Sequence, residues 1–378
     1  MCGSAGVPYD GCAQPNLCGV TEMDSEFVDV IVIGLGPAGA RAAEAAARAG
    51  CDVIALERRA EPGLPVQCAE FVPALIGQEL DGTVVRRREG ITSMATYVER
   101  DEPDNSPDFK GQIIDRDDFD RALVDRAKSV GADCRFGTRV VAVGGDGEVK
   151  TASGENFRSC VLIGADGPRS VLGAAIGARN VELVETRQIR VPLLKPFQAT
   201  DVWLSSAYPG GYAWLFPKGD VANLGLGVAA PWKSVLKPEL AKLHRALIAE
   251  GRVGAEILGH TGGAIPVNGV VGPVGQLREI PVMLAGDAAG LTHPISGAGI
   301  AAAVMSGHLA GEAAAAWQWQ DKDALDDYRD ELHCLFDRAL RRASDRRHAV
   351  LRQFEVGDGP DASALRRSWI AYPEYWAT

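Results

Sequence analysis

Cysteine is scarce in this sequence, and its scarcity excludes several kinds of protein. The 378 residues contain eight cysteines, without the repeated C-x-x-C pairs that hold zinc or iron–sulfur clusters. So few cysteines in so long a chain argue against a disulfide framework and predict reduced thiols in the cytoplasm. Cys2, Cys12 and Cys18 fall in residues 1–26, an expected flexible tail, at spacings that match no metal-binding pattern. We therefore expect no metal site.

The sequence also lacks an excess of positive charge and a long apolar run. The net charge is −11, which argues against binding to nucleic acid, because such proteins need a basic face. The longest uncharged stretch, 288–311, is rich in glycine and contains Pro294, so it predicts a loop and a buried helix rather than a membrane span. No secretory signal is visible at the N-terminus. Membrane contact is expected to be peripheral at most.

The length and the residue patterns predict an α/β protein. At about 150 residues per domain, 378 residues correspond to two or three units. Residues 28–33 are nearly all apolar, as in a strand buried on both faces, and alanine-rich residues 38–49 predict a helix that ends at Gly50. A second strand, 53–56, leads into Glu57. Further helices are expected over 117–130, 238–250, 298–317 and 324–354, and strands over much of 184–228.

A glycine-rich turn joins the first strand to the first helix. Its residues 34–39 read GLGPAG: Gly34 permits the tight turn, Gly36 lets a pyrophosphate approach the backbone, and Gly39 allows close helix–strand packing. The N-terminus of the helix presents free N–H groups to the phosphates. Glu57 ends the second strand, where a carboxylate accepts the ribose hydroxyls. The segment predicts binding of a dinucleotide with an unphosphorylated ribose.

Two later segments resemble motifs of class A flavoproteins, and the resemblance implies FAD. Residues 164–170 (GADGPRS), which include Asp166, are similar to the Asp-Gly motif of that class. Residues 286–290 (GDAAG), with Pro294 and then GAGI at 297–300, are similar to the motif in which Asp287 would bond the ribityl chain. Gly297, Gly299 and Ile300 begin a helix, so its N–H groups face the flavin pyrimidine edge.

Two further segments resemble the geranylgeranyl reductase family of FAD-dependent oxidoreductases. They are residues 65–71 (PVQCAEF) and residues 211–219 (GYAWLFPKG), the latter followed by ANLGLG at 222–227. The resemblance covers about 28–320. It implies a cysteine loop beside the flavin and an aromatic strand that lines a prenyl cavity. The cofactor-binding residues expected from all motifs are Gly34, Gly36, Ala38, Gly39, Glu57, Arg58, Cys68, Ala69, Arg116, Val140, Asp166, Asp287, Pro294, Gly297, Gly299 and Ile300.

The resemblance also implies a division into domains. A discontinuous Rossmann-type FAD domain of the p-hydroxybenzoate hydroxylase type is expected over 27–90, 111–183 and 278–320. A substrate domain built on an antiparallel sheet would take 91–110 and 184–277, and residues 321–378 would form a helical C-terminal segment.

Several side chains admit two interpretations. Cys68 is either a proton donor kept protonated in an apolar loop or a small buried hydrophobe. Tyr212, Trp214 and Phe216 share one face of a strand and form either a substrate wall or plain core. His293 is either an acid–base or substrate-contacting group or an ordinary loop residue. Two sets of charges are expected in solvent, a turn around Asp104 and the arginines at 341, 342, 346 and 347.

These features predict a reductase in which reduced flavin gives a hydride to a C=C bond of an isoprenoid or similar apolar substrate. A flavin monooxygenase acting on an aromatic, peptide-borne or natural-product substrate is the alternative, and a non-catalytic flavin- or lipid-binding protein the third hypothesis. The sequence contains no second G-x-G-x-x-G motif, which a separate NAD(P)H-binding domain would have. We therefore expect NAD(P)H to bind transiently, or an electron-carrier protein to reduce the flavin.

Overall fold

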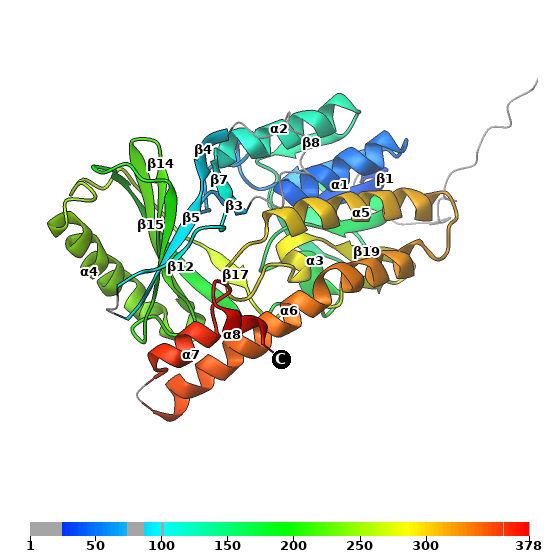
Figure 1. The fold of residues 1–378 in the computed structure, drawn as a ribbon. Helices are drawn as coiled ribbons and strands as arrows, with labels where there is room; N and C mark the ends of the chain where they lie inside the picture. The colour runs from blue at the N-terminus through cyan, green and yellow to red at the C-terminus, as the bar shows by residue number, and fades with distance from the viewer. Residues whose placement is uncertain (1–24, 74–86, 100–101, 358, 378) are drawn as a thin grey trace, which may run out of the picture.

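The computed structural model describes residues 25–73, 87–99, 102–357 and 359–377. Two large sheets lie side by side, and a long C-terminal helix runs beneath both (Figure 1). The expected tail cysteines lie outside the described residues. Among the described residues, no helix is long and apolar enough to cross a membrane.

The first sheet contains the nucleotide-binding strand and is mostly parallel. Its order is β18-β19-β11-β1-β2-β8, and β19, β11, β1, β2 and β8 run parallel. The central strands are apolar on both faces, as predicted for a sheet covered on both sides. Its strands are β1 (Glu26–Ile33), β2 (Val53–Glu57), β8 (Asp133–Phe136), β9 (Val140–Val143), β10 (Val149–Thr151), β11 (Asn156–Gly164), β18 (Val274–Leu277) and β19 (Ile280–Leu284).

Helix α1 lies between α2 and α5 beside this sheet (Figure 1). The backbones of α1 and α5 touch, since a Cβ at Gly307 or Gly311 would collide with the carbonyl oxygens of Ala38 and Ala42. This close packing places the N-termini of α1 and α5 in one site. The helices of this half are α1 (Pro37–Arg48), α2 (Arg116–Ser129), α3 (Val171–Ala175) and α5 (Ile300–Gln318), with a 3-10 turn η3 at Gly286–Ala289.

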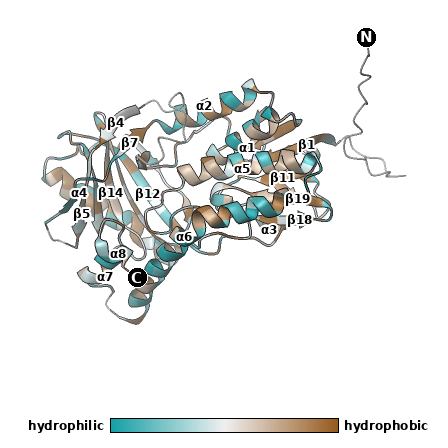
Figure 2. Ribbon diagram, turned by 45° about the vertical axis from the view of Figure 1, so that its right-hand side comes forward, coloured by the Kyte–Doolittle hydropathy of each residue, from teal (hydrophilic) through white to brown (hydrophobic). Residues whose placement is uncertain are grey.

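The second sheet is antiparallel except where β13 pairs with β5. Its order is β16-β12-β15-β14-β13-β5-β6, with β17 beside β12, and α4 (Leu236–Ala249) packs on one face. Apolar residues fill its centre (brown in Figure 2). The strands are β5 (Ser93–Val98), β6 (Asp104–Ser106), β12 (Leu183–Pro192), β13 (Ala199–Leu204), β14 (Ala213–Lys218), β15 (Val221–Ala229), β16 (Gly259–Thr261) and β17 (Ala264–Pro266).

A small third sheet and the C-terminal helices connect the two halves. The third sheet has the order β3-β7-β4, from Phe71–Pro73, Gly111–Ile114 and Arg87–Ile91. Helix α6 (Ala324–Val356) has 33 residues and is therefore about 50 Å long, enough to pass under both large sheets. Two short helices follow it, α7 (Ala362–Arg367) and α8 (Pro373–Trp376).

The structure corrects two expectations about charged residues. Asp104 is exposed, as expected, but it does not lie in a turn: it begins strand β6, and its carboxylate accepts hydrogen bonds from Tyr372 (2.7 Å) and Arg366 (3.3 Å) of the C-terminal segment. Arg347 does not face solvent, because this turn of α6 packs against the second sheet and leaves the side chain 4% exposed. The fold class is as predicted, while the domain boundaries stay a prediction.

Candidate flavin and substrate site

The glycine turn after β1 has the geometry that its sequence predicts. Gly34 has a φ of +96°, and a Cβ there would lie 2.4 Å from the carbonyl oxygen of Ala165. A Cβ on Gly39 would overlap the carbonyl of Gly34. Gly36 differs, because a Cβ there would meet nothing within 4 Å. The chain's own packing therefore does not require glycine at position 36, which leaves open space for a ligand.

Glu57 faces this turn from the end of β2. Its carboxylate accepts the backbone N–H groups of Leu35 and Arg59, each at 2.9 Å. Beside it lies a groove of about 390 Å³. The groove is lined by Arg58, Arg59, Pro65, Gln67 and Arg139. Val140, the next residue along the chain, begins β9. Of the expected residues, Arg58 lines this basic groove, while Glu57 and Val140 are each next in sequence to a residue that lines it.

Two half-buried aspartates, Asp166 and Asp287, follow the ends of β11 and β19. Asp166 Oδ2 accepts the N–H of Val171 (2.7 Å), but among the described residues its buried Oδ1 has no partner. Asp287 Oδ1 accepts the hydroxyl of Thr292 (2.6 Å). Burial raises the pKa of both carboxyls, although these bonds and, for Asp287, the positive charge of Arg116 oppose the shift.

Asn180 joins the two aspartate segments, and sequence reasoning missed it. Its amide donates to the carbonyl oxygens of Pro168 (3.2 Å) and Asp287 (2.8 Å). An isolated asparagine carries no motif signal, so only the tertiary contact identifies this role.

Arg116 occupies the first position of α2 and connects the cysteine loop with the flavin motifs. Its guanidinium makes two 3.0 Å bonds to Asp120 and a hydrogen bond to Cys68, and its charge acts on Asp287. Burial opposes the charged guanidinium, but Asp120 and Cys68 outweigh it and hold the pKa of Arg116 above its ordinary value. The structure thus brings Cys68, Arg116 and Asp287 together.

The environment of Cys68 is more polar than the sequence suggested. Its sulfur accepts the N–H of Glu70 (3.2 Å) and faces Arg116, instead of lying in an apolar loop. Its carbonyl oxygen accepts the Gln188 amide, whose own oxygen accepts the indole N–H of Trp214, each at 3.0 Å. The cysteine loop is therefore bonded directly to the aromatic strand.

Glu70, which follows this cysteine by two residues, is the main site residue that sequence reasoning missed. It is fully buried, with a φ of 66° that is unusual for a residue other than glycine. Its carboxylate accepts Lys218 (2.7 Å) and Asn223 (3.0 Å), and Lys218 also pairs with Asp115 (2.8 Å). The available signal was that Glu70, Lys218 and Asn223 all belong to motif segments, each with a polar group that needs a partner. Burial of an ion pair demands these bonds.

The aromatic strand is not an open wall. Tyr212, Trp214 and Phe216 lie on one face with ring centroids 5.7 and 6.4 Å apart. Trp369 of the C-terminal segment packs on Tyr212, with 4.8 Å between ring centroids, and Leu365 joins the same apolar cluster. These aromatics therefore contribute to a core, and their role as a substrate wall stays a prediction.

His293 lies in the loop before α5, and both its ring nitrogens have partners. The backbone N–H of Ser296 can only donate, so Nδ1 accepts it (3.2 Å) and the neutral ring has its proton on Nε2, 3.3 Å from the Tyr375 hydroxyl. Burial lowers the pKa of His293 to about 4. The ring is therefore neutral at pH 7 and links the flavin loop to the C-terminal segment. An acid–base role stays a prediction.

The residues present fit FAD. The open space over Gly36 suits a pyrophosphate, and the groove beside Glu57 suits an adenosine. Asp166 Oδ1, which has no partner among the described residues, can accept a hydrogen bond from the cofactor. The N-cap residues of α1 and α5 are Gly36 and Gly299, which supply no side-chain cap, so N–H groups in the first turn of each helix are available to phosphate and flavin oxygens. Pro294 and Gly297 lie in the loop before α5, and Ile300 is the first residue of that helix. Together with the fold, this site defines an FAD-dependent oxidoreductase.

Comparisons with known proteins agree with that class. A family model described as FAD binding domain matches residues 92–343. Digeranylgeranylglycerophospholipid reductase 1 of Methanopyrus kandleri is 34% identical over 317 residues, which are 76% of this chain and 80% of that protein. The enzyme of the same name from Methanosarcina acetivorans is 33% identical over 315 residues, covering 76% and 75%. The chain belongs to the geranylgeranyl reductase family of FAD-dependent oxidoreductases.

Solved structures show the same fold. A geranylgeranyl bacteriochlorophyll reductase-like protein from Thermoplasma acidophilum superposes with a TM-score of 0.76 at 26% identity, covering 93% of this chain and 98% of that one. A probable FAD-dependent monooxygenase from Pseudomonas aeruginosa gives 0.67 at 19% identity, covering 90% and 98%. The second likeness is one of fold alone.

Proposed function

We propose that this oxidoreductase reduces carbon–carbon double bonds of an isoprenoid lipid. The relatives that share about a third of its residues are named as reductases of a digeranylgeranyl lipid. The observation that carries the proposal is the position of Cys68. Its sulfur accepts the N–H of Glu70 (3.2 Å), and its carbonyl oxygen is linked through the Gln188 amide to the indole N–H of Trp214 on the aromatic strand. A thiol at this junction suits a reaction between a flavin and an apolar chain.

FAD, when bound and reduced, supplies the hydride that one carbon of the double bond receives. The other carbon needs a proton, and we assign its delivery to Cys68. The Glu70 N–H donates to the sulfur (3.2 Å) and the Arg116 guanidinium lies beside it, so both groups hold the thiol in position for the transfer. Solvent then returns the proton to the thiolate. Lys218 and Asn223 act at a distance by holding Glu70, and with it the loop.

We propose Tyr212, Trp214 and Phe216 as the apolar wall for the isoprenoid chain, which implies that the Trp369 ring shifts off the face of Tyr212. The aromatic rings contact Trp369 and Leu365 through apolar packing alone. Contacts of this kind are non-directional, so an apolar chain can replace them at little cost.

The reductant is proposed to be NAD(P)H in transient contact or an electron-carrier protein. The groove contains three arginines, Arg58, Arg59 and Arg139, and this positive charge supports an anionic donor. A cytoplasmic location and peripheral membrane contact also remain predictions.

The test uses the FAD-loaded protein, reduced without oxygen by dithionite and mixed with a geranylgeranyl lipid. Mass spectrometry should show a gain of two hydrogens for each double bond reduced. Cys68→Ala should lower the rate about 100-fold or more, and Cys134→Ala, which changes a half-buried thiol on β8, should not. Substrate-dependent oxygen uptake with one oxygen atom in the product would identify a monooxygenase instead. FAD binding without turnover would identify a binding protein.

A further inference from the structure

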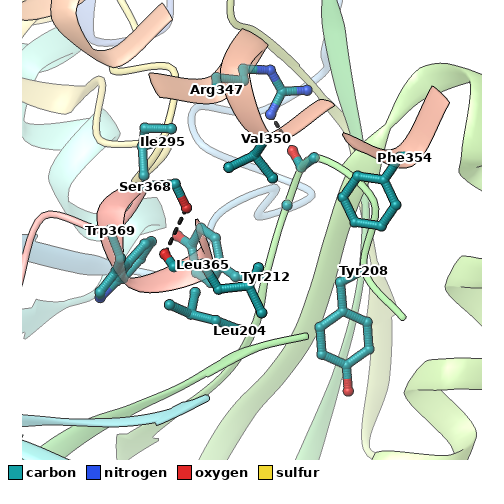
Figure 3. A pocket seen from close by; sticks show the side chains of 12 residues that line it. Leu204, Tyr208, Tyr212, Ile295, Arg347, Val350, Phe354, Leu365, Ser368 and Trp369 are labelled. Atoms are coloured by element: carbon teal, nitrogen blue, oxygen red, sulfur yellow. Dashed lines mark hydrogen bonds between the residues drawn. The ribbon is translucent and has the colours of Figure 1, made fainter. Parts of the chain in front are cut away.

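A small pocket lies between the second sheet and the C-terminal helices, outside the flavin motifs. Leu204 and Tyr208 form one side, Val350 and Phe354 of α6 another, and Leu365 of α7 closes it (Figure 3). Its volume is about 40 Å³. A water needs about 10–15 Å³, so the pocket has room for about three waters, or for the terminal oxygens of one phosphate group.

The lining contains a buried positive charge, Arg347. The side chain projects from α6, and one guanidinium nitrogen donates to the carbonyl oxygen of Gly210 (Figure 3). Its Nε is buried and has no hydrogen-bond partner in the part of the chain that the structure describes. Arg347 forms no ion pair with a described carboxylate either. Glu182, the carboxylate whose charge acts on it, is bonded to His348 at 2.8 Å instead.

A second buried donor lies in the same lining. Trp369 is 3% exposed, and its indole N–H has no acceptor among the described residues. Both unpartnered polar groups of the pocket therefore donate, and none accepts. Two hydroxyls of the lining already have acceptors: the Ser368 hydroxyl donates to the carbonyl oxygen of Leu365, and the Tyr212 hydroxyl to that of Ser296.

An unpaired charge is costly to bury, and an anion removes most of that cost. Burial lowers the pKa of Arg347 to about 10, which still leaves the guanidinium charged at pH 7. A guanidinium presents parallel N–H groups that match phosphate oxygens, and a charge-assisted bond is stronger than a neutral one. The pocket thus has the charge, the donors and the size for a single oxyanion.

We propose that Arg347 binds the phosphate of an amphiphilic lipid, whose apolar chain continues along Tyr212 toward Ile295. Ile295 lines this pocket and follows Pro294 of the flavin loop, so one ligand would reach from Arg347 to the flavin side. The proposal rests on the proposed function for the identity of the chain. The phosphate site itself rests on the pocket.

The test measures binding to the FAD-loaded protein by quenching of tryptophan fluorescence. The probes are geranylgeranyl phosphate, geranylgeraniol and inorganic phosphate. We expect the phosphate ester to bind more tightly than the alcohol, and Arg347→Met to weaken the ester about 10- to 100-fold while leaving the alcohol unchanged. The control is Arg346→Met, which removes the charge of the neighbouring residue. Arg346 donates to the carbonyl oxygens of Tyr375 and Ala377 and does not line the pocket.

The outcomes separate this proposal from the proposed function. Equal binding of ester and alcohol, unchanged in Arg347→Met, would overturn the phosphate site and leave the reductase proposal standing. Quenching by inorganic phosphate that depends on Arg347, without binding of either isoprenoid, would support the site and contradict the isoprenoid substrate. If Arg347→Met does not fold, competition by inorganic phosphate against the ester but not the alcohol decides the question in the unaltered protein. An absence of competition there would overturn the site.

Discussion

At the scale of the residue, the site depends on side chains whose surroundings differ from what their type suggests. Glu70 is a buried carboxylate with a left-handed backbone, Arg347 a buried cation, and Gly36 a glycine beside empty space. The chain's own bonds hold Glu70, whereas the protein's own packing does not explain Gly36 or Arg347. Such positions are where ligands and positioned groups are expected.

Gly36→Ala tests the open space directly. No described atom lies within 4 Å of the new methyl group and the φ of −73° suits alanine, so the stability of the FAD-free protein should not change. FAD affinity should fall about 10- to 100-fold, because the methyl group meets the pyrophosphate. Titration of the FAD-free protein with FAD measures this. The control is Gly145→Ala, which also meets nothing within 4 Å. Unchanged affinity in Gly36→Ala would place the pyrophosphate elsewhere.

We predict that the neutral His293 ring makes the free energy of unfolding sensitive to acid. The pKa is about 4 in the folded protein and about 6.5 when unfolded, so the unfolded chain binds the proton more tightly. The contribution is fully present above pH 6.5 and is lost as the pH falls toward 4, by at most about 3 kcal/mol. Denaturant unfolding at pH 7 and pH 4.5 should show a smaller difference for His293→Gln than for the unaltered protein. The exposed His260→Gln should leave that difference unchanged.

At the scale of the element, one buried network joins the cysteine loop to two strands and a helix. Glu70 bonds to Lys218 at the end of β14 and Asn223 on β15, and accepts the first N–H of α2 at Arg116. The loop is therefore held by two strands of the second sheet and by helix α2 of the first half. Its position relative to the flavin motifs follows from these bonds rather than from the loop itself.

Glu70→Ala should release that loop. It leaves Lys218 with Asp115 alone and Asn223 with only the carbonyl oxygen of Ala69, so the free energy of unfolding should fall by about 3 kcal/mol. Iodoacetamide should also alkylate Cys68 faster. Denaturant unfolding and mass spectrometry of the labelled protein measure both effects. Glu239→Ala breaks an exposed pair with Lys242 and should cost less than about 1 kcal/mol. Unchanged alkylation of Cys68 would contradict the positioning role.

At the scale of the whole molecule, the C-terminal segment covers the aromatic strand. Trp369 packs on Tyr212, Tyr375 reaches His293, and Asp104 binds Tyr372 from the far edge of the second sheet. The last residues of the chain thus contact the flavin loop, the aromatic face and strand β6 at once. Their release would open all three.

Trp369→Ala should detach this segment from the aromatic face. Loss of a buried tryptophan costs about 3–5 kcal/mol, and trypsin should then cut at Arg366 or Arg367 faster. Trp376→Ala, which changes a tryptophan that is 56% exposed in the same segment, should cost about 1 kcal/mol or less. Equal effects of the two substitutions would show that packing on Tyr212 does not hold the segment.

Local chemistry allowed the sequence by itself to determine much of this protein. The Gly34–Gly39 turn, the position of Glu57 and the alternation of Tyr212, Trp214 and Phe216 follow from backbone sterics and the two-residue repeat of a strand, and the structure has all of them. FAD and the family followed from motif order. Boundaries differed by a residue or two: α1 begins at Pro37 rather than at residue 38.

Only the tertiary structure decided which distant groups meet. Glu70 with Lys218 and Asn180 with Asp287 are more than a hundred residues apart, and no local pattern encodes such a pairing. Arg347 lies in a charged stretch of α6 that is typical of a solvent face, yet the end of the helix passes under the second sheet and buries it. The physical reason is the same in each case. Burial is set by what packs against a residue, and a charge that is buried must then find its partner wherever the fold provides one.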